Sequence, residues 1–325
     1  MPVKLRVRIM LFRNVLYDMA RFARHSFAIN SYGQENRRAI IRILAHYLEG
    51  GESFPAVRLG YGQEKAHSLI TKLDTYVFDF EVDDTILWAC ATLTSYLAFH
   101  RANDMPLFDL ERIQAEQADR LNIHARAGAG GSEIVTAKAI QGAVDFDFDA
   151  CLRNRHSVRQ YMPEPVSSEL IREIVANAQQ SPNVCNRQTC RVYAFNNRDV
   201  VQRILPLQAG NAGFRQEIST VFIVTSNLAH FNLIGERYQG WIDGGIFAMT
   251  LALSIHAKGL GACFLNWSVE KEADQTLRKT LGIPDNEIVI TLMSAGYLKD
   301  KFRVPVSSRK PLDHVLVLNR QLDLK

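Results

Sequence analysis

The sequence has no long uninterrupted apolar run. Within its 325 residues, no stretch reaches the roughly 18 apolar residues that a membrane-spanning helix needs. The longest apolar segments, near residues 86–99 and 242–255, are both interrupted by polar residues. At the N-terminus, basic residues alternate with apolar ones instead of preceding an unbroken apolar segment, so we expect no signal peptide. The pattern favours a cytoplasmic protein without a membrane-spanning helix.

Paired cysteines are also missing. The five cysteines are scattered, none belongs to a Cys-x-x-Cys pair, and no Cys/His group has the spacing of a zinc site. This pattern is typical of reduced thiols in a cytoplasmic protein. We therefore expect neither disulfides nor a bound metal.

A strong excess of positive charge is absent as well. Lys and Arg number 38 against 34 Asp and Glu, which leaves a net charge of +4. A nucleic-acid-binding domain usually concentrates basic residues far more strongly, so we expect no nucleic-acid partner. The N-terminal segment nevertheless places Lys4, Arg6, Arg8 and Arg13 among apolar residues. It permits two interpretations: a basic helix in peripheral contact with a membrane, or, as we prefer, a docked helix with a solvated basic face.

Residues 1–125 are predicted to form a helical N-terminal extension. Apolar residues recur at helical spacing over Asn36–Leu48, and Gly50 and Gly51 are expected to end that helix. Asp83 is suited to cap a further helix. No convincing strand alternation is found in this part of the sequence.

A glycine-rich segment follows and divides the chain. Ala125–Ser132 contains Gly-Ala-Gly, so a phosphate-binding loop is one interpretation. The segment matches neither Gly-x-Gly-x-x-Gly nor Gly-x-x-x-x-Gly-Lys-Ser/Thr, and no apolar strand leads into it. We therefore interpret residues 126–140 as a linker to a second domain over residues 141–325.

The second domain shows mixed helix and strand patterns. Strands are predicted over Arg191–Phe195, Ser219–Thr225, Ala262–Leu265 and Glu287–Tyr297. Helices are predicted over Ser167–Gln180, Asp243–Lys258 and Glu272–Leu281. The middle helix is apolar nearly all round, which predicts a buried position or a subunit interface. Because the connections are short and irregular, the expected fold class is α+β.

The segment Arg155-His156-Ser157-Val158-Arg159 combines basic side chains with a hydroxyl group. Arginine presents a planar fork of donors that matches phosphate oxygens, so the segment is able to bind a phosphate group. Taken alone, these five residues are better explained as a solvated basic turn.

An amide-rich loop, Ser181–Gln188, comes next along the chain. The side chains of Asn183, Asn186 and Gln188 offer both donors and acceptors, which suit the edge of a pyrimidine-like ring. The alternative is an Asn-rich turn whose side chains bond only their own backbone.

Two later segments complete the pattern. The apolar helix runs into Gly259–Trp267, and Ser307–Leu312 adds the cations Arg309 and Lys310. In this order, the four segments resemble the nitroreductase family of flavoproteins over roughly Cys151–Leu318. The resemblance implies an FMN-binding α+β fold with a mostly antiparallel central sheet flanked by helices. It also implies a homodimer with FMN at the subunit interface, and NAD(P)H as the reductant that serves a small-molecule substrate.

The resemblance implies a role for each matching residue. Arg155 and Ser157, with His156 between them, match the positions that hold the phosphate and ribityl side of the flavin. Arg159 matches the basic residue that reaches the pyrimidine carbonyl and tunes the ring electronically. The other implied contacts are Asn183, Asn186 and Gln188 at the pyrimidine edge, Leu265, Asn266 and Trp267 near flavin N5, and Arg309, with Lys310 as a weaker candidate, at the phosphate. No catalytic acid or base is implied.

The sequence departs from the family pattern beside the expected substrate position. Many relatives have Gln-Pro-Trp where this chain has Gln188-Thr189-Cys190, and several have Glu-Gly at Asn266-Trp267. A bulky Trp267 is expected to narrow the substrate side. Hydride transfer from NAD(P)H to an unidentified acceptor is the preferred function. The alternatives are a dedicated flavin enzyme for a polysaccharide- or lipid-linked intermediate, and a flavin-binding scaffold without turnover.

The helical extension carries a looser resemblance of its own. His46–Gly51 and Arg58–Gly62 are similar to a region found ahead of some nitroreductase domains linked to polysaccharide biosynthesis. His46 and Glu49 are three residues apart on a helix and could share a metal ion, but a packed or capping pair is preferred. For Cys185 and Cys190, which lie in and just after the amide loop, packing is preferred over redox chemistry.

Overall fold

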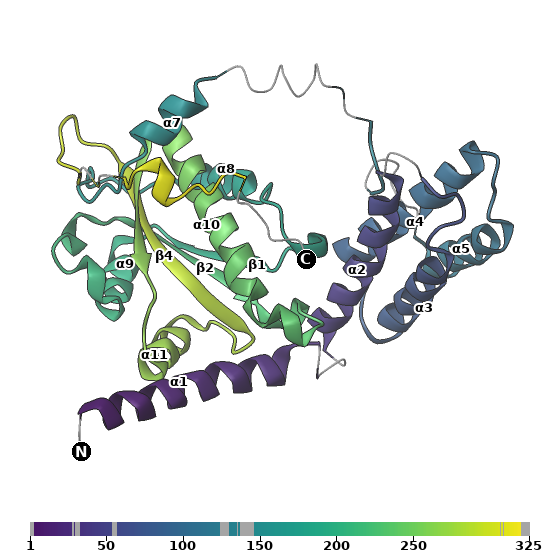
Figure 1. The fold of residues 1–325 in the computed structure, drawn as a ribbon, viewed down its shortest axis with the longest axis horizontal. Coiled ribbons are helices and arrows are strands. Elements are labelled where there is room, and N and C mark those ends of the chain that lie inside the picture. The colour runs from purple at the N-terminus through teal and green to yellow at the C-terminus, as the bar shows by residue number, and fades with distance from the viewer. Residues whose placement is uncertain are drawn as a thin grey trace.

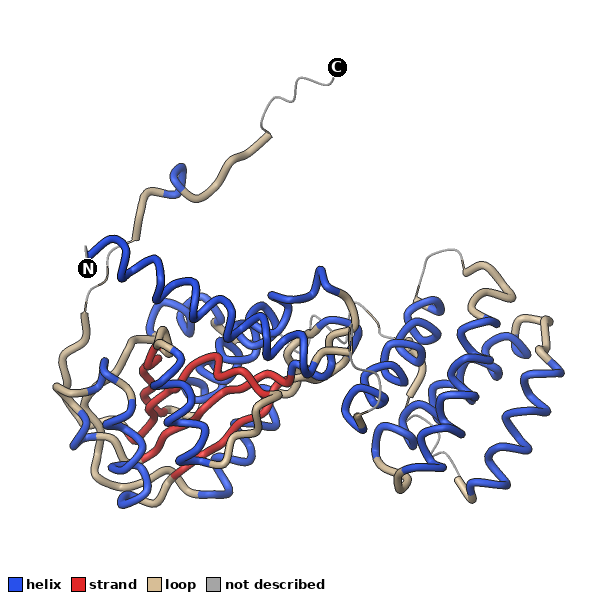
Figure 2. Tube along the Cα trace, turned by 90° about the horizontal axis from the view of Figure 1, so that it is seen from below, coloured by secondary structure: helices blue, strands red, loops and turns tan. Residues whose placement is uncertain are grey.

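The computed structural model describes residues 3–27, 29, 33–53, 57–123, 130–134, 136, 146–305, 307 and 309–319. Within them, a sheet domain and a smaller helical unit lie side by side (Figures 1 and 2). Most of the predicted linker, residues 126–140, lies outside the described residues. Among the described helices, none combines enough length with enough apolar character to cross a lipid bilayer.

Four strands form the sheet in the described part of the C-terminal domain. They are β1 (Cys190–Phe195), β2 (Thr220–Asn227), β3 (Leu260–Asn266) and β4 (Glu287–Tyr297). Their order in the sheet is β1-β2-β4-β3, and all three pairings are antiparallel. The predicted α+β class with an antiparallel central sheet is therefore confirmed, and β4 has the predicted bounds at both ends.

Helices cover both faces of this sheet. They are α8 (Ser168–Ala178) and α10 (Gln239–Ala257) on one face, and α9 (Arg198–Ile204) and α11 (Lys271–Leu281) on the other. Side chains of β2 alternate between the two faces, as the pleat of a strand requires. Val221 and Ile223 pack toward α9 and α11, whereas Phe222 and Val224 pack toward α8 and α10.

Local signals explain where several of these helices begin and end. Ser167 caps α8, because its Oγ accepts a hydrogen bond of 3.2 Å from the backbone N–H of Leu170. Gly282 ends α11 in a left-handed conformation with φ of 66°. A short helix, α7 (Phe148–Asn154), immediately precedes the basic segment at Arg155.

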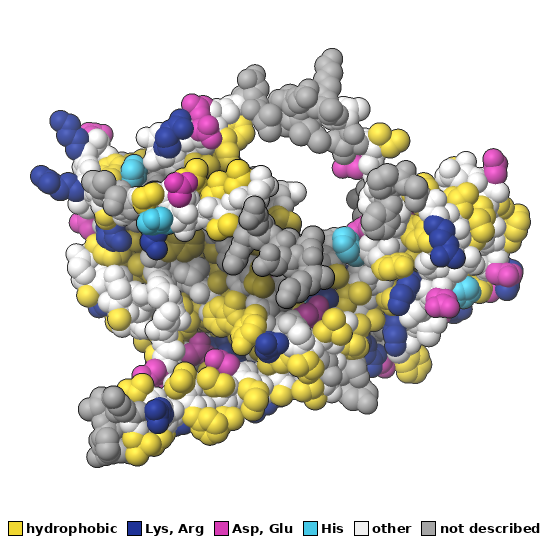
Figure 3. Space-filling model, viewed as in Figure 1, with side chains coloured by type: hydrophobic (Ala, Val, Ile, Leu, Met, Phe, Trp, Pro, Cys, Tyr) yellow, Lys and Arg dark blue, Asp and Glu magenta, His cyan; other side chains and the backbone are white. Residues whose placement is uncertain are grey.

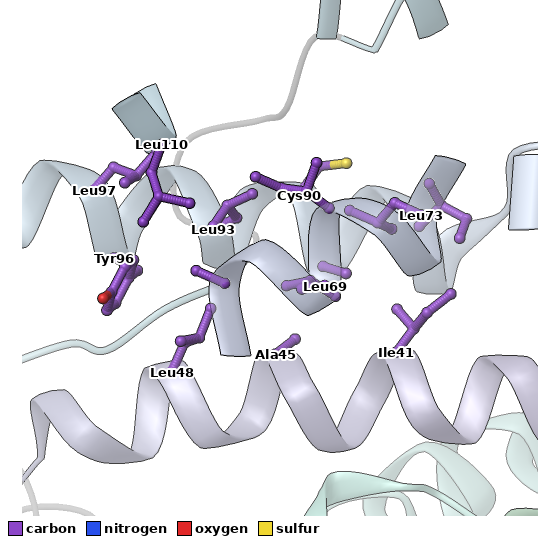
Figure 4. Close-up of a cluster of buried hydrophobic side chains, with 14 of the residues drawn as sticks. Ile41, Ala45, Leu48, Leu69, Leu73, Cys90, Leu93, Tyr96, Leu97 and Leu110 are labelled. Carbon is purple, nitrogen blue, oxygen red and sulfur yellow. The ribbon is translucent and has the colours of Figure 1, made fainter. Parts of the chain in front are cut away.

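The helical unit has a hydrophobic core of its own. It consists of α2 (Gln34–Glu52), α3 (Gln63–Asp79), α4 (Asp84–Ala102) and α5 (Phe108–Leu121). Ile41 and Leu48 of α2 point toward Leu69 of α3 and Leu93 of α4 inside this core (Figure 4). Asp83 caps α4 as predicted, since its carboxylate accepts from the backbone N–H groups of Thr85 and Ile86.

The end of α2 differs from the prediction. The helix continues through Gly50 and Gly51 and ends at Glu52. Gly51 faces the ring of Tyr61 so closely that a Cβ atom there would overlap the ring. The glycine therefore serves close packing between two segments, and the expectation that the pair ends the helix is wrong.

The start of α2 attaches the helical unit to the sheet domain. Asn36 donates a hydrogen bond of 2.7 Å from Nδ2 to the carbonyl oxygen of Ala229. Beside it, Glu35 Oε2 lies 2.8 Å from His230 Nε2. That hydrogen bond lowers the pKa of Glu35 to about 2, so the carboxylate stays charged at neutral pH.

The first helix, α1 (Val3–His25), packs on the C-terminal domain. Tyr17 Oη donates to Asp274 Oδ2 at 2.8 Å, and Arg21 donates to the carbonyl oxygens of Asp285 and Glu287. The helix is docked, as we preferred, but its outward side carries mainly apolar side chains such as Phe12. The expected basic residues, such as Arg8, are exposed as well, so the solvated side of the helix is both basic and apolar.

The two glycines of α2 give a matched pair of substitutions. Gly51→Ala should lower the free energy of unfolding by about 1–3 kcal/mol, because the new methyl group overlaps the Tyr61 ring. A Cβ atom at Gly50 would have no other atom within 4 Å, so Gly50→Ala should raise the free energy of unfolding by about 0.5–1 kcal/mol. Urea unfolding followed by circular dichroism measures both. Equal effects of the same sign would contradict the packing role of Gly51.

Candidate functional site

The basic segment 155–159 is held against the sheet by backbone contacts. Ser157 pairs with Ala262 of β3 as an isolated parallel bridge, and the N–H of Val158 donates to the carbonyl oxygen of Ala262 at 2.9 Å. Gly261 makes this approach feasible, since a Cβ there would lie 2.9 Å from the Cβ of Val158. The sheet therefore fixes the position of the basic segment.

A cavity of about 610 Å³ opens beside this segment. Its lining includes Arg155, His156 and Ser157, together with Arg309 from the C-terminal segment. None of the described side chains that line it is acidic. With Arg153, three arginines line the cavity, and their forks together with the Ser157 hydroxyl form a donor set suited to a phosphate group. The structure thus brings together the predicted phosphate residues from two distant segments.

Two residues that were predicted to contact the flavin, Arg159 and Lys310, do not line this cavity in the described part of the chain. Arg159 does not belong to the described lining, and its guanidinium lies over the ring of Phe214, 5.8 Å from the ring centroid. Arg159 also donates from Nη1 to the carbonyl oxygen of Ser157 at 3.3 Å. Lys310 is exposed and is absent from the described lining. Their flavin contacts stay predictions.

The amide loop has an unusual backbone. Cys185, Asn186 and Gln188 all have φ near 50°, in the left-handed region that non-glycine residues adopt infrequently. The carbonyl Oδ1 of Asn183 accepts from the backbone N–H of Gln188 at 2.8 Å, which closes the loop. Such conformations persist only where surrounding contacts hold them, and they cluster at binding sites.

Arg187 supplies those surrounding contacts. Its guanidinium is buried and donates to both carboxylate oxygens of Glu236, at 2.7 and 2.9 Å. It also donates to the carbonyl oxygen of His230 and to Asn232. Burial alone would raise the pKa of Glu236, but the hydrogen bond from Arg187 holds it below its ordinary value. Sequence reasoning missed this residue, because its partners lie more than forty residues away.

A second cavity, of about 90 Å³, lies beside the amide loop. Asn183, Gln188, Cys190 and Asp243 are among the side chains that line it. Asp243 is buried in the first half of α10, and burial raises its pKa. The sequence carried a signal for it, since a single carboxylate inside an otherwise apolar helix is unusual and often marks a functional site.

The predicted residues therefore form two groups at different points along α10. The amide loop lies beside Asp243 and Phe247, near the start of the helix. Arg155 lines a small cavity together with His256, near the end of the helix. Asp243 and His256 are separated by roughly 20 Å along the helix axis, at 1.5 Å per residue. Within one chain, the amide group is not adjacent to the arginine cavity.

The end of β3 contains the three residues whose backbone is predicted to lie near flavin N5. Leu265 and Trp267 are buried, and only Asn266 of the three predicted residues is exposed. The indole Nε1 of Trp267 donates to Asp274 Oδ1 at 3.1 Å. The ring thus points toward α11 and α1, so the expectation that it narrows a substrate site finds no support in its position.

The remaining candidate groups form local contacts. Burial raises the pKa of the Cys190 thiol to about 12, so this side chain is protonated at neutral pH and packs as a small apolar group. All five cysteines are free. His46 Nδ1 lies 2.9 Å from Glu49 Oε1, which makes them partners of each other.

Comparison with known proteins finds similar sequences for the C-terminal domain. The model of the nitroreductase family matches residues 152–226. A protein provisionally named NADH dehydrogenase/NAD(P)H nitroreductase from Archaeoglobus fulgidus is 27% identical over 157 residues, covering 47% of this chain and 88% of that protein. The 4-nitrobenzoate reductase of Pseudomonas putida is 22% identical over 232 residues. The match covers 54% of this chain and 97% of that protein.

Solved structures include one of a provisionally named nitroreductase from Desulfovibrio desulfuricans in complex with FMN. It is 23% identical, covers 55% of this chain and 100% of that one, and has a TM-score of 0.47. The family and sequence matches confirm the resemblance to the nitroreductase family that the motifs indicated in the C-terminal domain.

The contacts of Arg187 predict a large effect of its removal. Arg187→Met leaves the partly buried Glu236 carboxylate without its cation, and should lower the free energy of unfolding by about 3–5 kcal/mol. Adding Glu236→Gln to that variant should recover part of the loss, because the uncompensated charge disappears. Arg172→Met, at an exposed position of α8, is the control. Urea unfolding measures the free energy of unfolding of each variant. If Arg187→Met loses no more of it than the control does, the stabilising role assigned to Arg187 is wrong.

Proposed function

We propose that this protein is an FMN-dependent oxidoreductase whose two flavin sites lie between two copies of the chain. One observation carries the proposal: Arg155, Ser157 and Arg309 converge on a cavity of about 610 Å³ that no described acidic side chain lines. The nitroreductase family match, which begins at residue 152, covers the first two of these residues. The chemistry supplied by bound FMN is hydride transfer through N5 from NAD(P)H to a small-molecule acceptor.

The residues of the chain bind and orient the cofactor. Arg155 and Arg309 would each direct a planar fork of N–H donors to the phosphate, and the Ser157 hydroxyl would add a further donor. His156 and Lys310 would add positive charge at the rim. These contacts leave the ring end of the flavin to be recognised by groups from elsewhere.

The ring end would be recognised by the amide loop and the end of β3. Asn183, Asn186 and Gln188 would present donors and acceptors to the pyrimidine edge. Arg159 would add positive charge beside the ring, and the backbone of 265–267 would border N5. We assign no catalytic acid or base. The carboxylate beside the amide loop, Asp243, already accepts a hydrogen bond of 2.8 Å from Gln239 Nε2.

A homodimer would unite the two groups of residues. Ile242, Ile246 and Met249 recur on one side of α10 at helical spacing and are exposed, as is Trp241. An exposed apolar stripe of this kind marks an interaction surface. If two copies of α10 pack antiparallel about a two-fold axis, the amide loop of one copy comes beside the arginine cavity of the other.

The C-terminal segment supports the same assembly. The described residues 309–319 extend away from the body of their own chain (Figure 2). Leu312, Val315 and Val317 in this segment are exposed. A second copy would cover these apolar side chains, and Arg309 would be held at the cavity from which the segment departs.

Relatives support a nicotinamide as the reductant. One is the NADPH-dependent oxidoreductase of Staphylococcus saprophyticus, 21% identical over 184 residues, which cover 52% of this chain and 72% of that protein. The acceptor of this chain is a small molecule in our proposal, with NADH or NADPH as donor. An acceptor carried on a polysaccharide or lipid precursor is the alternative, and a cytoplasmic location suits both.

Flavin titration of the purified protein tests the proposal. We expect the wild type to quench FMN fluorescence, and Arg155→Ala and Arg309→Ala each to weaken FMN binding about 10- to 100-fold, because each removes charged hydrogen bonds. Arg203→Ala, at an exposed position of α9, should bind like the wild type. A wild type that binds no FMN refutes the proposal. Bound FMN that neither NADH nor NADPH bleaches anaerobically would instead favour a scaffold without turnover.

A further inference from the structure

Helix α1 is docked through its polar side. Asn14, Tyr17 and Arg21 lie on one stripe of the helix, at spacings of three and four residues. Asn14 Oδ1 accepts from the backbone N–H of Lys271 at 2.7 Å, and Tyr17 donates to Asp274. Arg21 is only 4% exposed and donates to the carbonyl oxygens of Asp285 and Glu287. These contacts fix the orientation of α1 on the C-terminal domain.

The opposite side of α1 is apolar and exposed. Leu5, Ile9, Phe12, Leu16 and Met19 follow one another at spacings of four and three residues and so form one continuous stripe. Phe12 is 64% exposed and Met19 is 59% exposed. Hydrophobic side chains occupy much of the visible side of α1 (Figure 3). A surface helix normally turns its apolar stripe toward the core, so this reversed orientation implies an external partner.

The charges on the same helix indicate the nature of that partner. Arg6, Arg8 and Arg13 lie beside or within the apolar stripe, and no acidic residue precedes Asp18 in the helix. Arg13 pairs with Glu272, whereas Arg6 and Arg8 have no ion-pair partner among the described residues. The N-terminal half of α1 extends past α11 toward the edge of the molecule (Figure 1). The partner should therefore present an apolar surface and negative charges side by side.

We propose that α1 binds the surface of an anionic lipid bilayer. The apolar stripe would enter the boundary between headgroups and acyl chains, as interfacial helices do. Arg6 and Arg8 would direct their guanidinium groups to anionic headgroups while their aliphatic stems stay in apolar surroundings. The polar side of α1 would keep the C-terminal domain attached at the surface. This property is independent of flavin binding.

A second copy of α1 is a poorer partner for this stripe. Face-to-face packing of two copies would bring two sets of arginines to one interface. None of the five stripe residues is a carboxylate, and the one acidic residue between Leu5 and Met19, Asp18, lies off the stripe. Like charges at an interface are destabilising, whereas an anionic bilayer offers a phosphate to each arginine. The charge pattern therefore favours the lipid surface.

Vesicle sedimentation of the full-length protein tests this proposal. We expect the wild type to sediment with vesicles of phosphatidylcholine and phosphatidylglycerol, and at least tenfold less with phosphatidylcholine alone. Phe12→Glu combined with Leu16→Glu should abolish binding. Arg6→Gln combined with Arg8→Gln should weaken it roughly tenfold or more, since each basic residue near an anionic surface contributes attraction.

A matched control and two outcomes decide the result. Phe78→Glu changes a phenylalanine of α3 that is 90% exposed and should leave vesicle binding unchanged. Circular dichroism checks that each variant is folded. The proposal is overturned if the wild type ignores anionic vesicles, or if the Phe12/Leu16 variant binds them equally well. It is also overturned if that variant turns a lipid-free dimer into a monomer, because α1 would then be an interface between copies.

Discussion

The close approach of segment 155–161 to the β3–β4 edge of the sheet is the constraint on which the candidate site depends. Backbone pairing of Ser157 and Val158 with Ala262 holds the segment, and Gly261 leaves room for it. Because Arg155 precedes this anchored stretch, its guanidinium is directed to the cavity that Arg309 reaches from the C-terminal segment. The proposed phosphate site therefore lies next to a segment that the sheet holds in place, which is where a binding site gains precision.

The amide loop depends on a different set of contacts. Arg187 fixes the strained loop through Glu236, and His230 Nδ1 contacts the carbonyl oxygen of Arg187 at 3.1 Å. His230 is in turn bonded to Glu35 at the start of α2. A short chain of hydrogen bonds thus connects the helical unit to the loop that we propose for the flavin ring. The helical unit supports the site although it contributes no predicted site residue.

Much of the fold followed from local patterns in the sequence. The bounds of β4 were predictable because a mostly apolar stretch begins at Ile288, just after the turn at Gly282 and Pro284. The cap of α8 was predictable because Ser167 precedes an amphipathic stretch. The prediction for Gly51 was wrong. A glycine near a helix end usually indicates that the helix stops there, but this one makes room for the ring of Tyr61, which is distant in the sequence. The orientation of α1 was also beyond local reasoning. Amphipathicity shows that one side is apolar, but not which side is buried.

The site was predictable in its parts but not in its arrangement. The arginines and the hydroxyl of the phosphate end could be named from the motif, and the structure gathers Arg155, Ser157 and Arg309. The separation of the amide loop from that cavity could not be foreseen, because it is set by the length of α10. Arg187 escaped notice for a related reason: its carboxylate partner, Glu236, is close only in the folded chain.

The central claim is that one flavin site takes residues from two copies of the chain. It is tested most directly by refolding two defective variants together and measuring bound FMN. One variant carries Arg155→Ala and Arg309→Ala, and the other carries Asn186→Ala and Gln188→Ala. Each alone should bind little FMN, whereas mixed dimers should regain one intact site of the two. A mixture that binds no more FMN than the separate variants would contradict the claim.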